Sequence, residues 1–100
     1  MRFQISTRLD DVTTNLVVVG EIDLASAPQL TLSISAALEA NGAECLVVDL
    51  TDVTFLDCAG IAALVRGTQL AHKHGRAYRW QGAQGMPLAV LELFGLTPTP

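Results

Sequence analysis

The sequence lacks the features of secreted and membrane-spanning proteins. It has only two cysteines among 100 residues, and no apolar run approaches the ~20 residues of a membrane-spanning helix. Met1 and Arg2 lead directly into alternating apolar and polar residues, a start that is not typical of a signal peptide. We therefore expect a cytoplasmic protein that does not insert into a membrane.

The two cysteines are expected to stay reduced and unpaired. Cys45 is expected to open an apolar strand that continues through residues 46–50, and Cys58 lies beyond its far end. Five residues in a strand span ~16 Å at ~3.3 Å per residue. A disulfide needs Cα atoms within roughly 7 Å of each other, so an intramolecular bridge is not expected.

Basic residues are missing from more than half of the chain. Between Leu9 and Val65 there are nine acidic residues and no lysine or arginine. Such an acidic segment would repel nucleic-acid phosphates and suits a basic protein partner. Solubility alone explains the acidic charge equally well.

Apolar periodicity predicts one α/β domain with the element order β-β-α-β-α-β-α. The expected strands are residues 3–8, 16–19, 45–50 and 77–81. The first expected helix begins after Ser26 and ends at Asn41-Gly42, and the other two are residues 59–73 and 86–94. Helical crossovers require parallel neighbours, so we expect a mixed sheet with helices packed against it. The domain is expected over residues 1–96, followed by a short Pro/Thr tail at 97–100.

Several residues are expected to end or begin these elements. Gly20 is expected to end the second strand, and residues 49–54 to form a polar loop. Ser26 and Gln29 have the spacing of a capping box. Asp57 suits the N-cap of the second helix, because its carboxylate can accept a hydrogen bond from a free N–H group of the first turn.

The apolar faces of the later helices and the last strand predict parts of the core. The core residues expected on these helices are Ile61, Leu64, Val65, Thr68, Ala71, Leu88, Leu91 and Phe94. Tyr78 and Trp80 alternate with Arg79 and are expected to face the core. The alternative is a stacking surface for nucleic acid formed with Arg76 and Arg79.

Two stretches give the sequence a family resemblance. Residues 49–60 read DLTDVTFLDCAG between an apolar strand and an apolar helix, and residues 20–23 read GEID. The sequence resembles STAS domains, and within them the bacterial anti-sigma-factor antagonists. It departs from that pattern at Cys58, where the family has a phosphorylated serine. It also lacks the further strand and closing helix that usually follow the segment ending at Leu96.

The resemblance implies a binding protein with no catalytic residues and no cofactor. Antagonists bind an anti-sigma factor, usually one with a kinase-like fold, and so regulate sigma-dependent transcription. The implied partner-binding residues are Glu21, Asp23, Thr54, Asp57, Cys58, Ala59 and Gly60, with Cys58 at the regulatory position. The alternative is a STAS accessory subunit of an ABC-type lipid transport complex. Residues 21–23 (EID) favour the antagonist over this alternative. A sheet edge left free by the short C-terminus would favour a homodimer.

Cys58 has two interpretations. At a helix N-terminus it could be a redox switch or a nucleophile, because a thiolate is stabilised there. The alternative, a small residue that occupies the space of the serine, is favoured because Asp57 opposes thiolate formation. His72 and His74 are expected ~20 Å away at the other end of the helix, so no Cys–His pair is expected. Because His72 and His74 are two residues apart on a helix, their side chains do not face one another, and no metal site is expected.

Overall fold

The computed structural model describes residues 2–40 and 44–96 of the chain. Within them the elements follow the predicted order β-β-α-β-α-β-α. The strands are β1 (Phe3–Asp10), β2 (Thr13–Ile22), β3 (Cys45–Leu56) and β4 (Ala77–Gln81), and the helices are α1 (Ala27–Glu39), α2 (Cys58–His74) and α3 (Gly85–Leu93). The expected helix end at Asn41-Gly42 and the tail at 97–100 involve positions outside the described residues.

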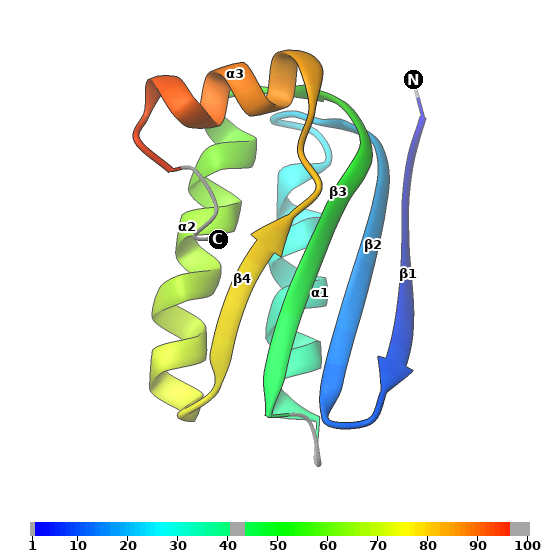
Figure 1. Ribbon diagram of the computed structural model, residues 1–100, viewed down its shortest axis with the longest axis vertical. Helices are drawn as coiled ribbons and strands as arrows, with labels where there is room; N and C mark the ends of the chain where they lie inside the picture. The colour runs from blue at the N-terminus through cyan, green and yellow to red at the C-terminus, as the bar shows by residue number, and fades with distance from the viewer. Residues whose placement is uncertain (1, 41–43, 97–100) are drawn as a thin grey trace.

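The four strands form one mixed sheet in the order β1-β2-β3-β4. β1 and β2 are an antiparallel hairpin in which Asp10 pairs with Thr13. Asp11 takes the turn position with a φ of 56°, a conformation that aspartate tolerates better than most residues. β3 is parallel to both β2 and β4, so the carboxyl ends of β2, β3 and β4 lie at one end of the sheet (Figure 1).

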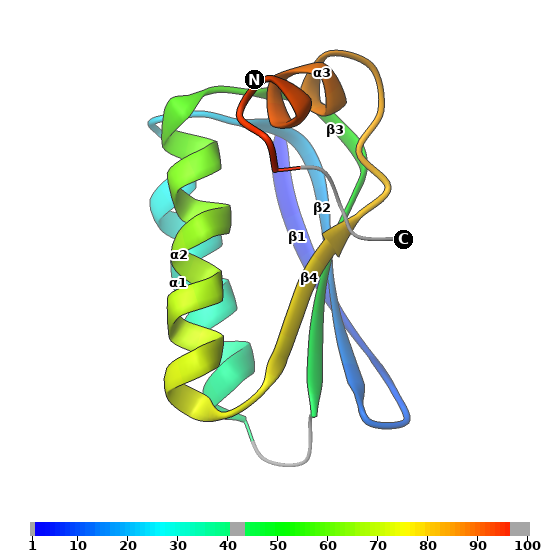
Figure 2. The same cartoon turned by 60° about the vertical axis from the view of Figure 1, so that its left-hand side comes forward.

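The helices define one covered and one open face of the sheet. α1 and α2 lie side by side against the same face, and no helix of the described residues lies against the other (Figures 1 and 2). We call that second surface the open face. α3 lies across the carboxyl end of β3, close to the start of α2 (Figure 1). None of the described helices has the length and apolarity needed to cross a membrane.

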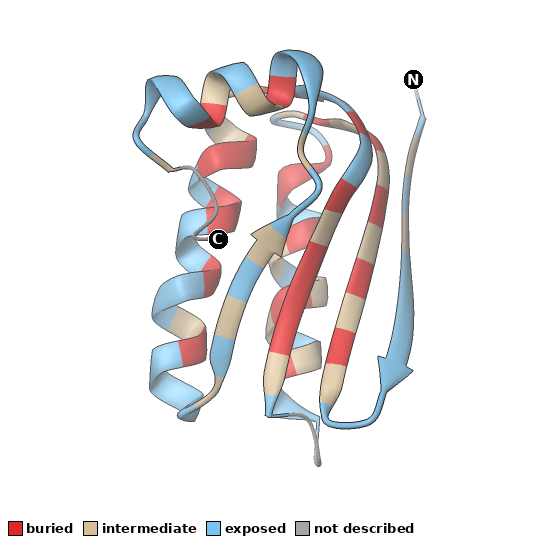
Figure 3. Cartoon of the chain, in the orientation of Figure 1, coloured by how far each residue is buried: buried red, intermediate tan, exposed pale blue. Residues whose placement is uncertain are grey.

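The core lies between the sheet and α1 and α2. Along β2 the residues alternate between buried and half-buried, as expected of a strand with one covered face (Figure 3). The fully buried side chains of the strands and helices include Leu16, Val18, Ile22, Leu30, Ile34, Leu38, Leu46, Val48, Leu50, Leu64 and Leu91. Burying such a side chain contributes roughly 1.5–3 kcal/mol.

Two strands are longer than the sequence predicts. The prediction of a polar loop at residues 49–54 is wrong, because β3 continues to Leu56 and pairs with β2 as far as Ile22. Gly20 does not end β2. It lies within the strand with a φ of 106°, and the pairing of β2 with β3 shifts between Gly20 and Glu21. The pairing also shifts between Val17 and Val19, so polar residues are accommodated in a bent strand rather than in a loop.

Three residues assigned to the core are exposed. Val65 and Thr68 lie on the outer flank of α2, because its buried face is centred on Gly60, Leu64, Gly67 and Ala71. Glycines carry no apolar side chain, so the pattern of apolar residues gave the wrong helix rotation. Phe94 follows the last residue of α3 and is 53% exposed. The turn at Gly95 lets Leu96, half-buried, pack against the core instead.

Tyr78 and Trp80 pack against the core, which confirms the prediction for β4. Their rings meet edge to face with centroids 5.8 Å apart. The Tyr78 hydroxyl donates a hydrogen bond of 2.7 Å to the carbonyl oxygen of Leu64 in α2. Burial raises the pKa of the Tyr78 phenol well above its ordinary value, so the hydroxyl stays a donor at neutral pH.

Candidate functional site

The two stretches that carry the family pattern lie side by side at the carboxyl end of the sheet. Parallel pairing places Glu21 opposite Phe55 and Ile22 opposite Leu56. The backbone N–H of Asp57 then donates a hydrogen bond of 3.3 Å to the carbonyl oxygen of Ile22. The loop after β2 and the turn after β3 therefore form one continuous surface.

The turn between β3 and α2 is organised by Asp57. Its Oδ1 accepts hydrogen bonds from the backbone N–H groups of Ala59, at 3.0 Å, and Gly60, at 3.1 Å. This confirms the predicted N-cap and satisfies two donors that the first helical turn leaves free. Cys58 is the first helical residue, and its side chain is exposed at the positive end of the helix dipole.

Gly60 lies beneath this turn and is buried. A Cβ atom there would lie 2.9 Å from both the carbonyl oxygen and Cγ2 of Ile22, and 2.5 Å from Cδ1 of Leu56. A residue without a side chain is therefore required for α2 to approach the ends of β2 and β3. Gly60 shapes the surface on which Cys58 and Ala59 lie.

The loop between β2 and α1 is held by Asp23 and Ser26. The Oδ1 atom of Asp23 accepts hydrogen bonds from the N–H groups of Ala25, at 3.0 Å, and Ser26, at 3.1 Å. The predicted capping box is wrong, because the Ser26 side chain does not bind a helical N–H group. Ser26 has helical backbone angles, and its hydroxyl turns back to accept from Asp23 N at 3.0 Å and donate to the Glu21 carbonyl at 2.8 Å.

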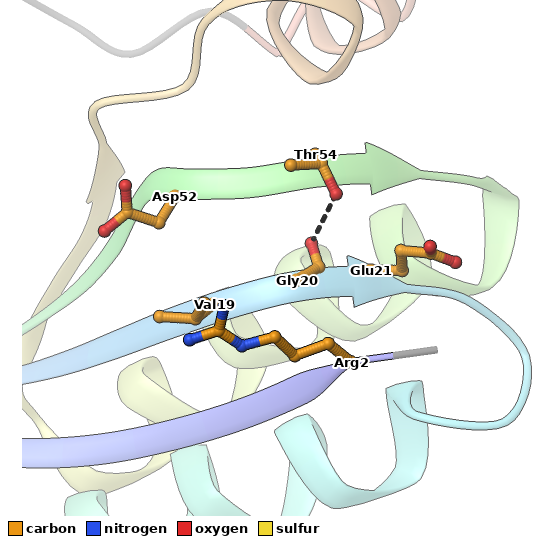
Figure 4. Close-up of a pocket in the computed structure, with 6 residues that line it drawn as sticks. All are labelled: Arg2, Val19, Gly20, Glu21, Asp52 and Thr54. Carbon is orange, nitrogen blue, oxygen red and sulfur yellow. Dashed lines mark hydrogen bonds between the residues drawn. The ribbon is translucent and has the colours of Figure 1, made fainter.

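Glu21 and Thr54 lie on the open face rather than beside Cys58. Thr54 is at the shift in pairing between β2 and β3, and its Oγ1 donates a hydrogen bond of 3.4 Å to the carbonyl oxygen of Gly20. Both side chains line a pocket of about 470 Å³ (Figure 4). Strand irregularities of this kind re-aim side chains, which explains why Thr54 faces this pocket.

The remaining polar candidates lie far from this surface. His72 and His74 are in the last turn of α2, whereas Cys58 is in its first. Cys45 opens β3 at the opposite end of the sheet, and both cysteines are free. Within residues 2–40 and 44–96 no three His, Cys, Asp or Glu side chains are arranged to hold a metal ion.

The sequence alone did not reveal an apolar groove beside the Cys58 turn. This groove, of about 390 Å³, lies between the first turns of α1 and α2 and is lined by Leu24, Ala27, Pro28, Thr31, Ala59, Ala62, Ala63 and Arg66. Leu24 is 79% exposed, although it directly follows the ordered residue Asp23. The available signal in the sequence was Leu24, an apolar residue between Asp23 and the small residues 25–27. Its place in a groove becomes evident only from the packing of α1 against α2.

A comparison with protein-family models identifies the fold. The model described as "Mlab, STAS domain" matches residues 5–98. The chain belongs to the STAS domain family. The order of its four strands and three helices matches that of STAS domains, as the sequence predicts. No curated protein matches this STAS domain.

Solved structures include antagonists of anti-sigma factors. An anti-sigma factor antagonist from Mycobacterium paratuberculosis is 28% identical, with a TM-score of 0.82 over 95% of this chain and 80% of the other. The antagonist SpoIIAA in its unphosphorylated form is 17% identical, with a TM-score of 0.77 over 95% and 82% of the two chains. The Bacillus cell fate determinant SpoIIAA in its phosphorylated form is also 17% identical, with a TM-score of 0.70 over 95% and 85%. At 17% identity these two likenesses concern the fold alone.

Proposed function

We propose that this STAS domain binds an anti-sigma factor and thereby regulates sigma-dependent transcription. The observation that carries the proposal is the direct contact between the Asp23 loop and the Asp57–Gly60 turn, joined through Asp57 N and Ile22 O. The likeness to the Mycobacterium paratuberculosis antagonist supports the same role. The partner is an anti-sigma factor with a kinase-like fold, met in the cytoplasm, and the domain itself is not an enzyme.

The chemistry of the surface supports a protein partner. Asp23 and Asp57 each use one carboxylate oxygen to hold their own loop, so the backbone there is ordered before binding. Ordered loops lose less conformational entropy when they are immobilised at an interface. The groove next to Cys58 offers exposed Leu24 as an apolar anchor, and the neighbouring acidic residues favour a basic partner.

We further propose that serine phosphorylation does not switch this protein off. In the family a phosphoserine would place a doubly charged group at the position of Cys58, inside the docking surface. Such a charge is costly to bury and disrupts an interface. Cys58 and Ala59 carry no hydroxyl group, so neither can accept the phosphate of a serine kinase. The domain then stays competent to bind its partner whatever the kinase activity.

Oxidation of Cys58 would be a substitute switch. Its side chain is exposed, which a redox-sensitive thiol requires. Partner affinity measured before and after peroxide treatment, in the wild type and in Cys58→Ser, separates the two possibilities. A loss of affinity in the wild type alone supports the redox switch, whereas equal affinities mean that Cys58 only fills the space of the serine.

Affinity capture from a lysate of the source organism, followed by mass spectrometry, tests the proposed function. The expected product is an anti-sigma factor, captured by the wild type and lost with the charge reversal Asp23→Lys. The captured protein is then incubated with the domain and labelled ATP. No phosphopeptide containing residue 58 is expected, and Cys58→Ser is expected to gain one. Stoichiometric label on the wild-type peptide would contradict the proposed loss of the switch.

The second candidate is an accessory subunit of an ABC-type lipid transport complex. The matching family model is named for Mlab and not for the antagonists, so family membership alone does not separate the candidates. The residues 21–23 and the likeness to the mycobacterial antagonist favour the sigma-regulatory role. Capture of a transport ATPase instead of an anti-sigma factor would decide for the second candidate.

A further inference from the structure

Two pockets flank the end of β3 on the molecular surface, and they share Asp52 and Thr54. The first, which we call the Glu21 pocket, has a volume of about 470 Å³ and is lined by Arg2, Val19, Gly20, Glu21, Asp52 and Thr54. The second, which we call the Met86 pocket, has a volume of about 390 Å³ and is lined by Thr51, Asp52, Val53, Thr54, Gln84, Gly85, Met86 and Pro87. Because they share two residues, the pockets adjoin one another across the strand, and we call the two together the track.

The Glu21 pocket combines carboxylates with an apolar floor. Figure 4 shows the side chains of Glu21 and Asp52 at its two ends, with Val19 and Arg2 between them. Two carboxylates and one guanidinium leave the pocket with a net negative charge. The surrounding chain adds no lysine or arginine between Leu9 and Val65. A cationic side chain therefore complements this pocket better than an anionic one.

The Met86 pocket is more apolar and its wall is fixed. Met86 is 42% exposed, while Pro87 and Val53 are buried and supply apolar lining. The segment before α3 is held in place because the Nε2 atom of Gln84 donates a hydrogen bond of 3.0 Å to the carbonyl oxygen of Thr51. Methionine packs against varied apolar partners, so an exposed methionine here suits an apolar side chain of a partner.

The track is continuous with the proposed docking surface. Glu21 and Thr54 belong to the family pattern and yet line the Glu21 pocket rather than the Cys58 turn. Phe55, which follows Thr54, is 37% exposed and leads along β3 to Asp57. In the described residues no helix covers this open face (Figure 2). A partner that contacts the Asp57–Gly60 turn can therefore extend over the end of β3 without displacing any described element.

We propose that this track binds an extended segment of the anti-sigma factor that carries a basic side chain and a neighbouring apolar side chain. The basic side chain enters the Glu21 pocket at the end formed by Asp52, which also lines the Met86 pocket, and the apolar side chain packs on Met86. The inference rests on the proposed function and adds a second area of contact to it. The phosphoserine position then lies at one edge of the interface and the track at the other.

Two substitutions test the track. Asp52→Lys reverses the charge shared by both pockets, and Met86→Ser removes the apolar surface. Matched controls lie at the opposite end of the sheet. Asp10→Lys makes the same charge reversal, and Leu9→Ser also replaces an exposed apolar side chain by serine, since Leu9 is 76% exposed. The dissociation constant for the captured anti-sigma factor is expected to rise about tenfold for each track variant, as removal of an interface anchor does. The controls are expected to bind like the wild type.

The salt dependence of association gives an independent readout. Asp52→Lys, and more mildly Asp52→Asn, should slow association and flatten its dependence on ionic strength, because the charge pair no longer steers the encounter. Met86→Ser should instead speed dissociation. Thermal unfolding of each variant establishes that it is folded, and Asp52→Asn serves where charge reversal prevents folding.

The outcomes separate the two proposals. If the wild type binds the anti-sigma factor and the track variants bind equally well, the track proposal is overturned and the proposed function stands. If the wild type captures no anti-sigma factor, both fall. If the track variants change only the mass of the free domain in sedimentation, the open face is a contact between copies and the track proposal is wrong. The track proposal would also be overturned if inorganic phosphate bound to the pocket through Arg2 while the track variants kept the partner affinity of the wild type.

Discussion

The backbone N–H of Asp57 donates a hydrogen bond of 3.3 Å to the carbonyl oxygen of Ile22. This contact joins the first residue after β3 to the last residue of β2, at the point where the two strands stop pairing. It turns two segments that are distant in the sequence into one surface. The stability of that surface and its capacity to bind can therefore be tested separately.

Replacing Asp57 by alanine tests the N-cap of α2. The change removes the acceptor of two backbone N–H groups, those of Ala59 and Gly60. The free energy of unfolding is expected to fall by about 1 kcal/mol, the usual effect of losing an N-cap side chain. Chemical denaturation measures the change. Asp57→Asn and Asp57→Ser keep an acceptor oxygen and should recover most of the loss, and a loss equal to that of alanine would contradict the cap.

Replacing Gly60 by alanine tests the close approach of α2 to the strands. The added Cβ would lie 2.9 Å from the Ile22 carbonyl oxygen, a backbone atom that cannot move without disturbing β2. Overpacking of this kind costs about 1–3 kcal/mol. Ala62→Ser is the control, because Ala62 is exposed on the same helix. Thermal unfolding should show a clear decrease for Gly60→Ala and almost none for the control.

Local chemistry explains which parts of the fold could be predicted from the sequence. The Asp57 cap and β4 depend on residues close in sequence, and both were placed correctly. The end of α2 at Gly75 is set by local conformation in the same way. The Gly75 end has a left-handed φ of 66°, as a C-terminal glycine usually does. The full length of β3 was missed because polar Thr51 and Asp52 suggested a loop. Only the pairing with β2 makes strand geometry favourable there.

The family pattern selects candidate residues for the site, but it does not give their layout in the fold. The family pattern selected Glu21 and Thr54 together with Cys58. The irregular pairing of β2 with β3 turns Glu21 and Thr54 onto the open face, and no local signal reports such a shift. The capping box at Ser26 failed for a related reason, since its hydroxyl finds closer partners in the backbone of the preceding loop. Contacts between distant segments decided both cases.

Replacing Cys58 by aspartate should separate stability from binding. A negative charge at the first position of α2 meets the positive end of the helix dipole and is expected to stabilise the fold by about 0.3–1 kcal/mol, reduced by repulsion from Asp57. In the proposed docking surface the partner would bury the same charge, which should lower affinity about tenfold or more. Thermal unfolding and calorimetric binding to the captured anti-sigma factor measure the two effects.

The isosteric change Cys58→Ser is the control for that experiment. It keeps the size of the side chain and adds no charge, so both stability and affinity should stay close to those of the wild type. A loss of affinity with serine as large as that with aspartate would mean that the thiol itself contacts the partner. An unchanged affinity of Cys58→Asp would show that Cys58 lies outside the interface.

Replacing Tyr78 by phenylalanine tests the hydrogen bond that ties β4 to α2. Removing the hydroxyl should cost about 1 kcal/mol at neutral pH, because the Leu64 carbonyl loses a donor. Burial raises the pKa of Tyr78 above its ordinary value of about 10, so the folded state holds the phenolic proton more tightly than the unfolded state. The stability that depends on this proton is complete below about pH 10 and is lost as the pH rises further.

Denaturation at increasing pH should therefore show a decline in the wild type that is weaker in Tyr78→Phe, so the difference between the two proteins shrinks above about pH 10. Tyr78 is the only tyrosine, so the ultraviolet absorbance of tyrosinate reports its ionisation alone. That absorbance should appear together with unfolding rather than before it. Tyrosinate formation near pH 10 in a protein that is still folded would show that the hydroxyl is open to water and that its bond to Leu64 does not hold β4 against α2.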